Sequence, residues 1–173
     1  MIEFEPGGRG VEPLKAACDA PPPRSIRRVP AGQLYHFQWH LLRVQGPACC
    51  TFLPTHGAHP SIPARVVMGY FIGLHMRGAA ELREFLPGPD RKAQIALSVA
   101  NAWQGRGIGT ALMAEALRVA RERGIEQLHL TCHALNRRMQ RIAERFGARI
   151  GFEGCECFAE ITLRDKARAA AVP

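Results

Sequence analysis

Short stretches of apolar side chains, several alternating strictly with polar ones, predict a chain rich in β-strands. The alternation is clearest in residues 93–99, 127–132 and 156–163. The full set of expected strands is 25–29, 66–74, 78–85, 91–99, 127–132 and 156–163. A tight connection is expected near residues 75–77 and a turn over residues 86–90, where Pro, Gly and Asp gather.

Three other stretches place apolar residues at helical spacing. They cover residues 31–44, 110–123 and 136–146. Asn136 is a plausible N-cap of the last one, and Gly124 and Gly147 follow the second and third as expected of helix ends. Strands outnumber helices, which indicates a mixed sheet with helices packed against it.

Composition divides the chain into one folded unit and two tails. Residues 1–24 are rich in Gly, Pro and charge and are expected to form a poorly ordered arm, while residues 164–173 form a charged, Ala-rich tail. Residues 25–163 are expected to form a single domain. Residues 46–63 hold four prolines and two histidines. They could be a substrate-facing loop or simple filler.

Charge and cysteine usage narrow the surroundings of the protein. The net charge of +8 suits a polyanionic ligand, but no block of like charge is long enough to indicate a nucleic-acid partner. No leader-like apolar segment opens the chain, and the longest near-apolar run, 66–74, is too short to span a bilayer. The six cysteines match no Cys-x-x-Cys pattern. We therefore expect reduced thiols, no membrane partner and a cytoplasmic location.

His36 and His40 lie four residues apart, on one face of the first expected helix. Two histidines at this spacing can bind a metal ion, but no third ligand is evident in the sequence. We therefore expect no metal.

The candidate chemistry lies in a glycine-rich stretch between an expected strand and an expected helix, residues 103–110. The start of a helix leaves N–H groups without partners and favours an anion, and glycines let the backbone approach it closely. The alternative is a glycine-rich turn without a ligand. No lysine follows Gly109, which excludes a P-loop, and Thr110 replaces the third glycine of a Rossmann fingerprint. The remaining pattern is Gln104-x-x-Gly107-x-Gly109.

With Leu97-Ser98-Val99 before it, this pattern resembles the acetyl-coenzyme A pyrophosphate loop of the GNAT superfamily of N-acetyltransferases. Residues 93–148 match the family's two best-marked segments in order: strand, glycine loop, helix, strand, then an Asn-led helix ending in Arg-Phe-Gly. The resemblance implies a single α/β (α+β mixed) domain with a central, mixed, twisted sheet of about six to seven strands flanked by about four helices. Residues 25–163 would be the acetyltransferase domain.

The resemblance also implies a coenzyme site. The backbone of Leu97, Ser98 and Val99 would pair with the pantetheine arm like an added strand, and one N–H would polarise the thioester carbonyl. Asn136 would hydrogen-bond the pantetheine or serve only as a helix cap. Arg137 or Arg138 could meet the phosphates or adenine, or be solvated. The residues expected around the pyrophosphate are Gln104, Gly105, Arg106, Gly107, Ile108, Gly109 and Thr110.

The sequence departs from its relatives at the positions that move protons. Many family members carry a tyrosine acid where this chain has Ala143, and relatives that acetylate protein lysines often carry a glutamate where it has Gln94. The best-placed base candidate is Glu81, with a water chain as an equal alternative. Cys132 is expected to be a buried, inert thiol rather than a nucleophile. Weaker candidates for the base are Glu84, His129, His133 and Glu160.

These features predict an acetyl-coenzyme A-dependent N-acetyltransferase. Acetyl-coenzyme A would be the co-substrate, and the acetyl group would move directly, in a ternary complex, to a small amine, an amino-acid derivative or a protein lysine. The alternative is a catalytically weak acyl-coenzyme A-binding sensor or regulatory module, which Gln94 and Ala143 would suit. Family enzymes often dimerise, and the sequence leaves a homodimer open.

Overall fold

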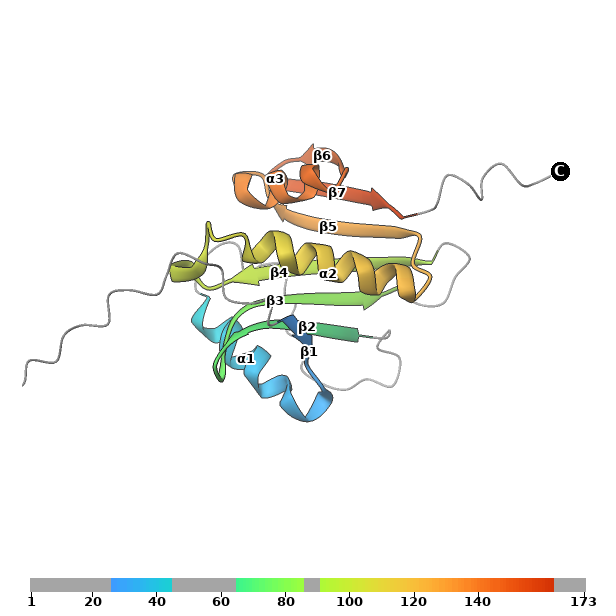
Figure 1. The fold of residues 1–173 in the computed structure, drawn as a ribbon. Helices are drawn as coiled ribbons and strands as arrows, with labels where there is room; N and C mark the ends of the chain where they lie inside the picture. The colour runs from blue at the N-terminus through green and yellow to red at the C-terminus, as the bar shows by residue number, and fades with distance from the viewer. Residues whose placement is uncertain (1–25, 45–64, 86–90, 164–173) are drawn as a thin grey trace, which may run out of the picture.

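Seven strands form one mixed sheet in the order β1-β2-β3-β4-β5-β7-β6 (Figure 1). The computed structural model describes residues 26–44, 65–85 and 91–163, so the predictions for the two tails, for residues 46–63 and for the turn at 86–90 lie outside the described residues. β4 and β5 are parallel and every other neighbouring pair is antiparallel. The strands are β1 (Ile26–Arg28), β2 (Arg65–Ile72), β3 (His75–Glu84), β4 (Lys92–Val99), β5 (Gln127–His133), β6 (Arg149–Glu153) and β7 (Glu156–Thr162).

Helices cover both faces of this sheet. α1 packs on one face, mainly against β3, and α2 packs on the other face across β2, β3 and β4, with α3 beside it over β6 and β7. About four helices were expected, whereas the described residues contain three α-helices and two short 3₁₀ turns. The helices are α1 (Leu34–Arg43), α2 (Ile108–Glu122) and α3 (Arg137–Arg145), with η1 (Ala31–Gln33) before α1 and η3 (Asn101–Trp103) before α2. None of the helices in the described ranges is long and apolar enough to cross a membrane.

The two faces have separate hydrophobic cores, and β4 contributes alternate residues to each. Ile95 and Leu97 belong to the core under α2, whereas Ala96 belongs to the core under α1. Since side chains alternate along a strand, Ser98 also points to the α1 side. Apolar residues at helical spacing form the inward face of α2, and four of them are fully buried: Leu112, Ala116, Val119 and Ala120.

One local prediction was wrong, and one strand was not predicted. The connection between β2 and β3 lies at Gly73 and Leu74, not at residues 75–77, because Gly73 supplies the positive φ of the turn, +57°. The strand Arg149–Glu153, β6, was not predicted from the sequence. It lies at the edge of the sheet and its side chains are mostly exposed, so its five residues show no inward-outward alternation.

The parallel pairing of β4 with β5, in the middle of the sheet, is short. β4 and β5 pair only at Lys92↔Gln127, Ala93↔Leu128 and Gln94↔His129. Beyond that point β4 stays with β3 up to Val99, and β5 stays with β7 up to His133. The sheet is therefore split between its two central strands.

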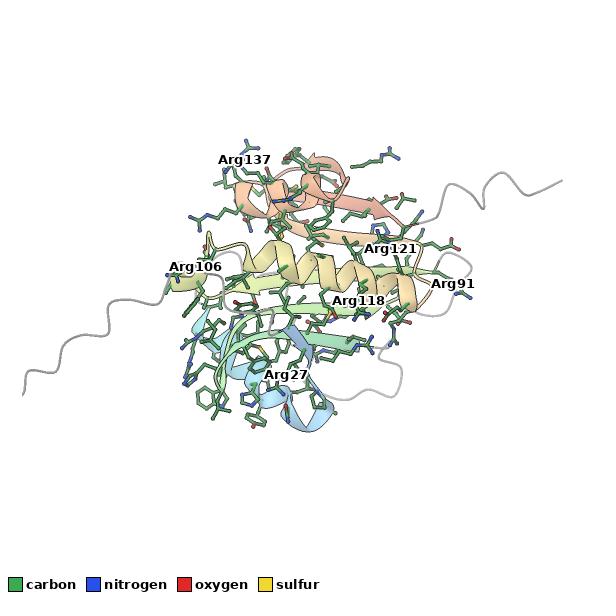
Figure 2. All side chains as sticks on the ribbon, in the orientation of Figure 1. Arg27, Arg91, Arg106, Arg118, Arg121 and Arg137 are labelled. Atoms are coloured by element: carbon green, nitrogen blue, oxygen red, sulfur yellow. The ribbon has the colours of Figure 1, made fainter. Side chains whose placement is uncertain are left out.

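Arginine side chains are spread over the described surface rather than gathered on one face. The arginines labelled in Figure 2 come from β1, the glycine loop, α2, α3 and the position just before β4. This scatter agrees with the lack of a block of like charge in the sequence. The labelled examples are Arg27, Arg91, Arg106, Arg118, Arg121 and Arg137.

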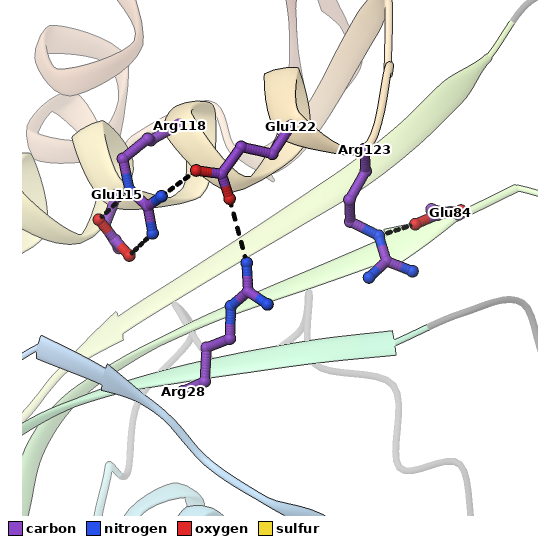
Figure 3. Close-up of polar contacts among 6 residues, drawn as sticks. All are labelled: Arg28, Glu84, Glu115, Arg118, Glu122 and Arg123. Atoms are coloured by element: carbon purple, nitrogen blue, oxygen red, sulfur yellow. Dashed lines mark hydrogen bonds and ion pairs between the residues drawn. The ribbon is translucent and has the colours of Figure 1, made fainter.

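Two other arginines, Arg28 and Arg123, form ion pairs that link the end of α2 to the sheet (Figure 3). Arg28 of β1 lies 3.2 Å from Glu122, which also pairs with Arg118 one turn back. Arg123, just after α2, pairs with Glu84 of β3. Exposed pairs of this kind contribute less than about 1 kcal/mol each, so they orient the helix end more than they stabilise it.

Gly124 ends α2 as the sequence predicts. Its φ is +70°, its N–H donates to Arg121 O at 2.9 Å, and Ile125 N–H donates to Ala120 O at 2.9 Å. These two bonds form a Schellman motif, which turns the chain into β5.

We expect Gly124→Ala to lower the free energy of unfolding by about 1–2 kcal/mol, the usual cost of a left-handed conformation for a residue with a Cβ. The added Cβ would also lie 2.4 Å from Arg91 Nη1, which would have to move. Gly151→Ala is the control, because its Cβ would meet nothing within 4 Å. Urea denaturation measures both, and equal stabilities of the two variants would contradict the assignment.

Candidate functional site

The split in the sheet leaves one edge of β4 open. Phe85 N–H donates to Lys92 O at 3.0 Å, and Ala100 N–H donates to Arg77 O at 2.9 Å. In an antiparallel pair such bonds recur at every second residue, so the even-numbered residues of β4 use their backbone groups on β3. The odd-numbered residues of β4 direct their backbone N–H and C=O groups to the opposite edge, toward β5.

Leu97 and Val99 are therefore the residues of β4 whose backbone N–H groups face the split, past the last β4–β5 pair at Gln94. The Val99 carbonyl on this edge accepts a hydrogen bond from Gln104 Nε2 at 3.0 Å. Ser98 has its backbone turned to Ala79 of β3. An extended polar ligand can thus pair with this edge as a further strand would.

A cavity of about 490 Å³ opens at the split. Of the residues predicted to hold a cofactor, all except Arg106 line it. Its walls come from both faces of the sheet, since Val44 ends α1 while Met139 and Ile142 belong to α3. The full lining is Val44, Leu97, Ser98, Val99, Trp103, Gln104, Gly105, Gly107, Ile108, Gly109, Thr110, Asn136, Arg138, Met139, Arg141 and Ile142.

The glycine loop forms one end of this cavity. Gly105 and Gly107 both have φ +78°, and a Cβ on either would meet nothing within 4 Å, so conformation and not space requires glycine. Gly107 is the N-cap of α2, and its carbonyl accepts the N–H of Ala111 at 3.0 Å. The N–H groups of the first turn before Ala111 have no acceptor within the helix and are suited to an anion.

Gly109 has a different role. A Cβ there would lie 2.9 Å from Ile142 Cδ1, so the Ile142 side chain would have to move. The absent side chain at Gly109 therefore lets Ile142 of α3 pack directly against the start of α2.

Gln104 links the loop to its surroundings. Its Nε2 donates to Val99 O and, at 3.1 Å, to Asn101 Oδ1, while its Oε1 accepts from Arg138 of α3. Arg106 lies outside the lining, with its guanidinium 4.7 Å from the centre of the Trp103 ring. Trp103 in turn contributes to the cavity wall.

Asn136 caps α3, as expected, by accepting the N–H of Met139 at 3.1 Å. It also lines the cavity, and its amide nitrogen is the atom that can donate to a ligand. Its contact with a ligand stays a prediction. Arg138 lines the cavity, while Arg137 donates to Gln140 Oε1 at 2.9 Å instead.

Five residues of the lining were not among those expected to contact a ligand, although one of them, Trp103, begins the glycine-rich stretch. Arg141 follows Arg138 by three positions, so helical spacing could have shown that the two share a face. Met139 and Ile142 are apolar residues at helical spacing, a pattern that indicates packing and not contact with a ligand. Val44 carries no signal, because it is more than fifty positions away from the rest in the chain.

Glu81 is 1% exposed and lies between two arginines. Its Oε1 is 2.5 Å from Arg65 Nε and 2.7 Å from Arg83 Nε, and its Oε2 accepts from Arg83 Nη2 at 3.1 Å. It does not line the cavity. These contacts account for the buried carboxylate without a role in catalysis, and its assignment as a base stays a prediction that they do not support.

Of the weaker candidates, His129 and Glu160 do not line the cavity, although His129 Nε2 is buried without a hydrogen-bond partner among the described residues. Two others are engaged, and Cys132 is inert. Glu84 pairs with Arg123, and His133 Nδ1 accepts the N–H of Leu135 at 3.1 Å. Burial and the neighbouring Cys157 raise the pKa of the Cys132 thiol to about 12, so it stays protonated at neutral pH. This matches the expected inert thiol.

A histidine and a serine form a buried pair that sequence reasoning did not find. His40 Nε2 of α1 lies 2.8 Å from Ser98 Oγ of β4, and the two residues are 3% and 8% exposed. Burial lowers the pKa of His40 below its usual value, and the positive charges of Arg43 and Arg77 act in the same direction. Backbone hydrogen bonds at Met76 and Ser98 oppose this shift.

His36, the other member of the histidine pair seen in the sequence, lies against Phe71 with ring centres 5.7 Å apart. His40 uses Nε2 for Ser98, so the two imidazoles are engaged separately. Across the described ranges, no three His, Cys, Asp or Glu side chains are grouped so as to hold a metal ion.

The chain was compared with known protein families, curated proteins and solved structures. The sequence model of the acetyltransferase (GNAT) family matches residues 30–148. No curated protein matches the chain in sequence.

Solved structures share the fold at low sequence identity. The GNAT domain of S. lividans PAT is 21% identical with a TM-score of 0.64, over 80% of this chain and 89% of that one. The ribosomal-protein-S18-alanine N-acetyltransferase of Escherichia coli is 16% identical with a TM-score of 0.63, over 82% and 95%. YncA of Salmonella typhimurium, determined with its cofactor acetyl-CoA, is 16% identical with a TM-score of 0.53, over 60% and 67%.

We expect Glu81→Gln to lower the free energy of unfolding by about 3 kcal/mol, the usual cost of removing one partner from a buried ion pair. Glu84→Gln is the control, because its pair with Arg123 is partly exposed and should cost less than about 1 kcal/mol. Urea denaturation compares the two. A Glu81→Gln protein as stable as the wild type would contradict the structural role and restore Glu81 as a candidate base.

Proposed function

Because the chain belongs to the acetyltransferase (GNAT) family, we propose that it is an N-acetyltransferase that moves an acetyl group from acetyl-coenzyme A to a primary amine. The attack is direct, in a ternary complex. The observation that carries the proposal is the cavity at the β4–β5 split, which joins an open strand edge to a glycine loop at a helix start. Acetyl-coenzyme A needs both features, because it has an amide-rich arm and a pyrophosphate.

We place the pantetheine arm along the open edge of β4, where Leu97 and Val99 offer backbone groups and Asn136 offers an amide. The pyrophosphate would lie at the start of α2, on the N–H groups of the glycine loop. Arg138 and Arg141 add positive charge on the α3 side. The predicted loop residues are Gln104, Gly105, Arg106, Gly107, Ile108, Gly109 and Thr110, of which Arg106 would act from outside the cavity wall.

The thioester supplies an activated acetyl carbonyl. A backbone N–H of Leu97 or Val99 would stabilise the negative charge that develops on the carbonyl oxygen during attack. Since α2 and α3 cover the coenzyme side of the sheet, the acceptor amine would enter from the α1 side, where Val44 and Ser98 meet the cavity. The acceptor is a small amine, an amino-acid derivative or a protein lysine.

A second function, an acyl-coenzyme A sensor, is favoured by one observation. The family's usual proton-transfer positions hold Gln94 and Ala143, and Ala143 is fully buried in the core. A sensor would bind the coenzyme at the same cavity without turnover. A homodimer and a cytoplasmic location stay predictions from the sequence.

Calorimetric titration with acetyl-coenzyme A, followed by a thiol-release assay on a mixed panel of amines and lysine peptides, separates these functions. Binding with amine-dependent thiol release supports the transferase. Binding without release, also in the presence of cell extract, supports the sensor. No binding contradicts both.

Gly107→Val should abolish detectable acetyl-coenzyme A binding, because a β-branched residue cannot readily hold φ +78° and the loop must rearrange. Gly154→Val is the control. It introduces the same side chain at a positive φ, +56°, in open space away from the cavity. Calorimetry should show wild-type affinity for the control, and unchanged affinity in Gly107→Val would contradict the loop assignment.

Arg141→Ala should weaken acetyl-coenzyme A binding by about fivefold, because it removes one charge-assisted contact at a partly solvated site. The loss should shrink as salt is added, since the contact is electrostatic. Arg145→Ala on the same helix is the control, because Arg145 is exposed and does not line the cavity. Equal affinities of the two variants at low salt would remove Arg141 from the site.

A further inference from the structure

We propose that Ser98 and His40 form the proton relay that takes a proton from the acceptor amine, with Ser98 Oγ meeting the amine and His40 acting behind it as a positioning and proton-holding residue. The relay rests on the proposed transferase function. It supplies the base that the family's usual positions do not supply in this chain.

Ser98 is placed where the amine must arrive. Its side chain points to the α1 side of the sheet and lines the cavity, while its neighbours Leu97 and Val99 turn their backbone N–H groups into the split. An acetyl carbonyl bound at either N–H would therefore have the Ser98 hydroxyl beside it. The hydroxyl lies on the face from which the acceptor enters.

His40 can act on a substrate only through Ser98. It does not line the cavity, it is 3% exposed, and its Nε2 lies 2.8 Å from Ser98 Oγ. A hydroxyl within hydrogen-bond reach of an imidazole is the arrangement by which proteins pass a proton from a weak acid to a base. With the ring proton on Nδ1, Nε2 is free to accept the proton of the Ser98 hydroxyl.

The surroundings of His40 suit a base that is neutral at rest. Burial and the charges of Arg43, on its own helix, and Arg77, on β3, favour the uncharged ring. Backbone bonds at Met76 and Ser98 stabilise the ring once it has gained a proton.

The acidic group of this face is not available to His40. The carboxylate of Glu81 is paired with Arg65 and Arg83. In the described part of the chain, His40 is therefore the proton acceptor that contacts the cavity wall, through Ser98.

The proposed step conserves atoms and charge. The ammonium proton passes to Ser98 Oγ as the Ser98 proton passes to His40 Nε2, which leaves a neutral amine and an imidazolium. The amine nitrogen then forms a C–N bond to the acetyl carbon, the C–S bond breaks, and the thiolate takes the second proton of the amine. His40 finally returns its proton to solvent, so one proton is released for each acetyl group transferred.

Three variants test the relay with the panel amine that gives the fastest thiol release. His40→Gln keeps a polar group behind Ser98 but cannot hold the proton, and Ser98→Ala removes the connection. Each should lower kcat about 100-fold, a usual contribution of a general base, and the double variant should be no worse than either single one. His36→Gln, one turn earlier on α1, is the matched control and should keep wild-type kcat.

The pH profile gives a readout that a purely structural role would not move. The neutral form of His40 is the active one, so wild-type kcat should fall as the pH drops through a pKa below the 6.5 of an ordinary histidine. This acid limb should disappear in His40→Gln and persist in His36→Gln. Calorimetry should show acetyl-coenzyme A affinity within twofold of the wild type for His40→Gln.

Several outcomes would overturn the relay. One is a His40→Gln protein that keeps kcat within twofold and retains the acid limb. If thermal unfolding shows that this variant does not fold, a Ser98→Ala protein with wild-type kcat overturns the relay by itself. Acetylation of Ser98, seen by intact-mass measurement after incubation with acetyl-coenzyme A alone, would replace it with a covalent intermediate.

The relay and the transferase function fail differently. If the wild-type protein binds acetyl-coenzyme A but none of the panel amines causes thiol release, both the transferase function and the relay are overturned. A wild-type protein that turns over while its His40 and Ser98 variants do so equally well overturns the relay alone.

Discussion

The backbone hydrogen bonds of β4 are the constraint on which the site depends. Every N–H and C=O of a buried strand needs a partner, and β3 satisfies one edge of β4 along its whole length. The other edge is paired with β5 over three positions and is then open to the cavity. A ligand that brings amide groups to Leu97 and Val99 completes the sheet. The split therefore creates both the space for an extended ligand and the reason for it to bind there.

The neighbouring helices convert this open edge into a shaped cavity. The glycine loop lets α2 begin at the end of β4, and the missing side chain at Gly109 lets Ile142 of α3 pack against the start of α2. Gln104 then connects β4, the loop and Arg138. Rigid elements thus hold the residues proposed to bind the coenzyme on one face, while α1 brings Val44 and His40 to the other. In the proposed reaction, acetyl-coenzyme A and the acceptor amine would approach the split between β4 and β5 from opposite faces of the sheet and meet there.

Charges in this arginine-rich chain divide into two groups. Glu81 is enclosed by Arg65 and Arg83, and the pairs around α2 serve its attachment to the sheet. Arg138 and Arg141 instead line the cavity. The net charge of +8 is therefore a poor guide to function by itself. The position of each arginine decides whether it stabilises the fold or meets an anionic ligand.

The sequence alone determined the three helices, six of the strands and the glycine loop, because periodicity, caps and positive-φ glycines act over a few neighbouring residues. Asn136 as a cap and Gly124 as a helix end were predictable for that reason. The sequence could not predict β6, because its five edge residues show too little alternation of apolar and polar side chains. Nor could the sequence show that His40 pairs with Ser98. These residues are 58 positions apart, and only the packing of α1 on this face of the sheet, a sum of many weak contacts, brings their side chains to 2.8 Å.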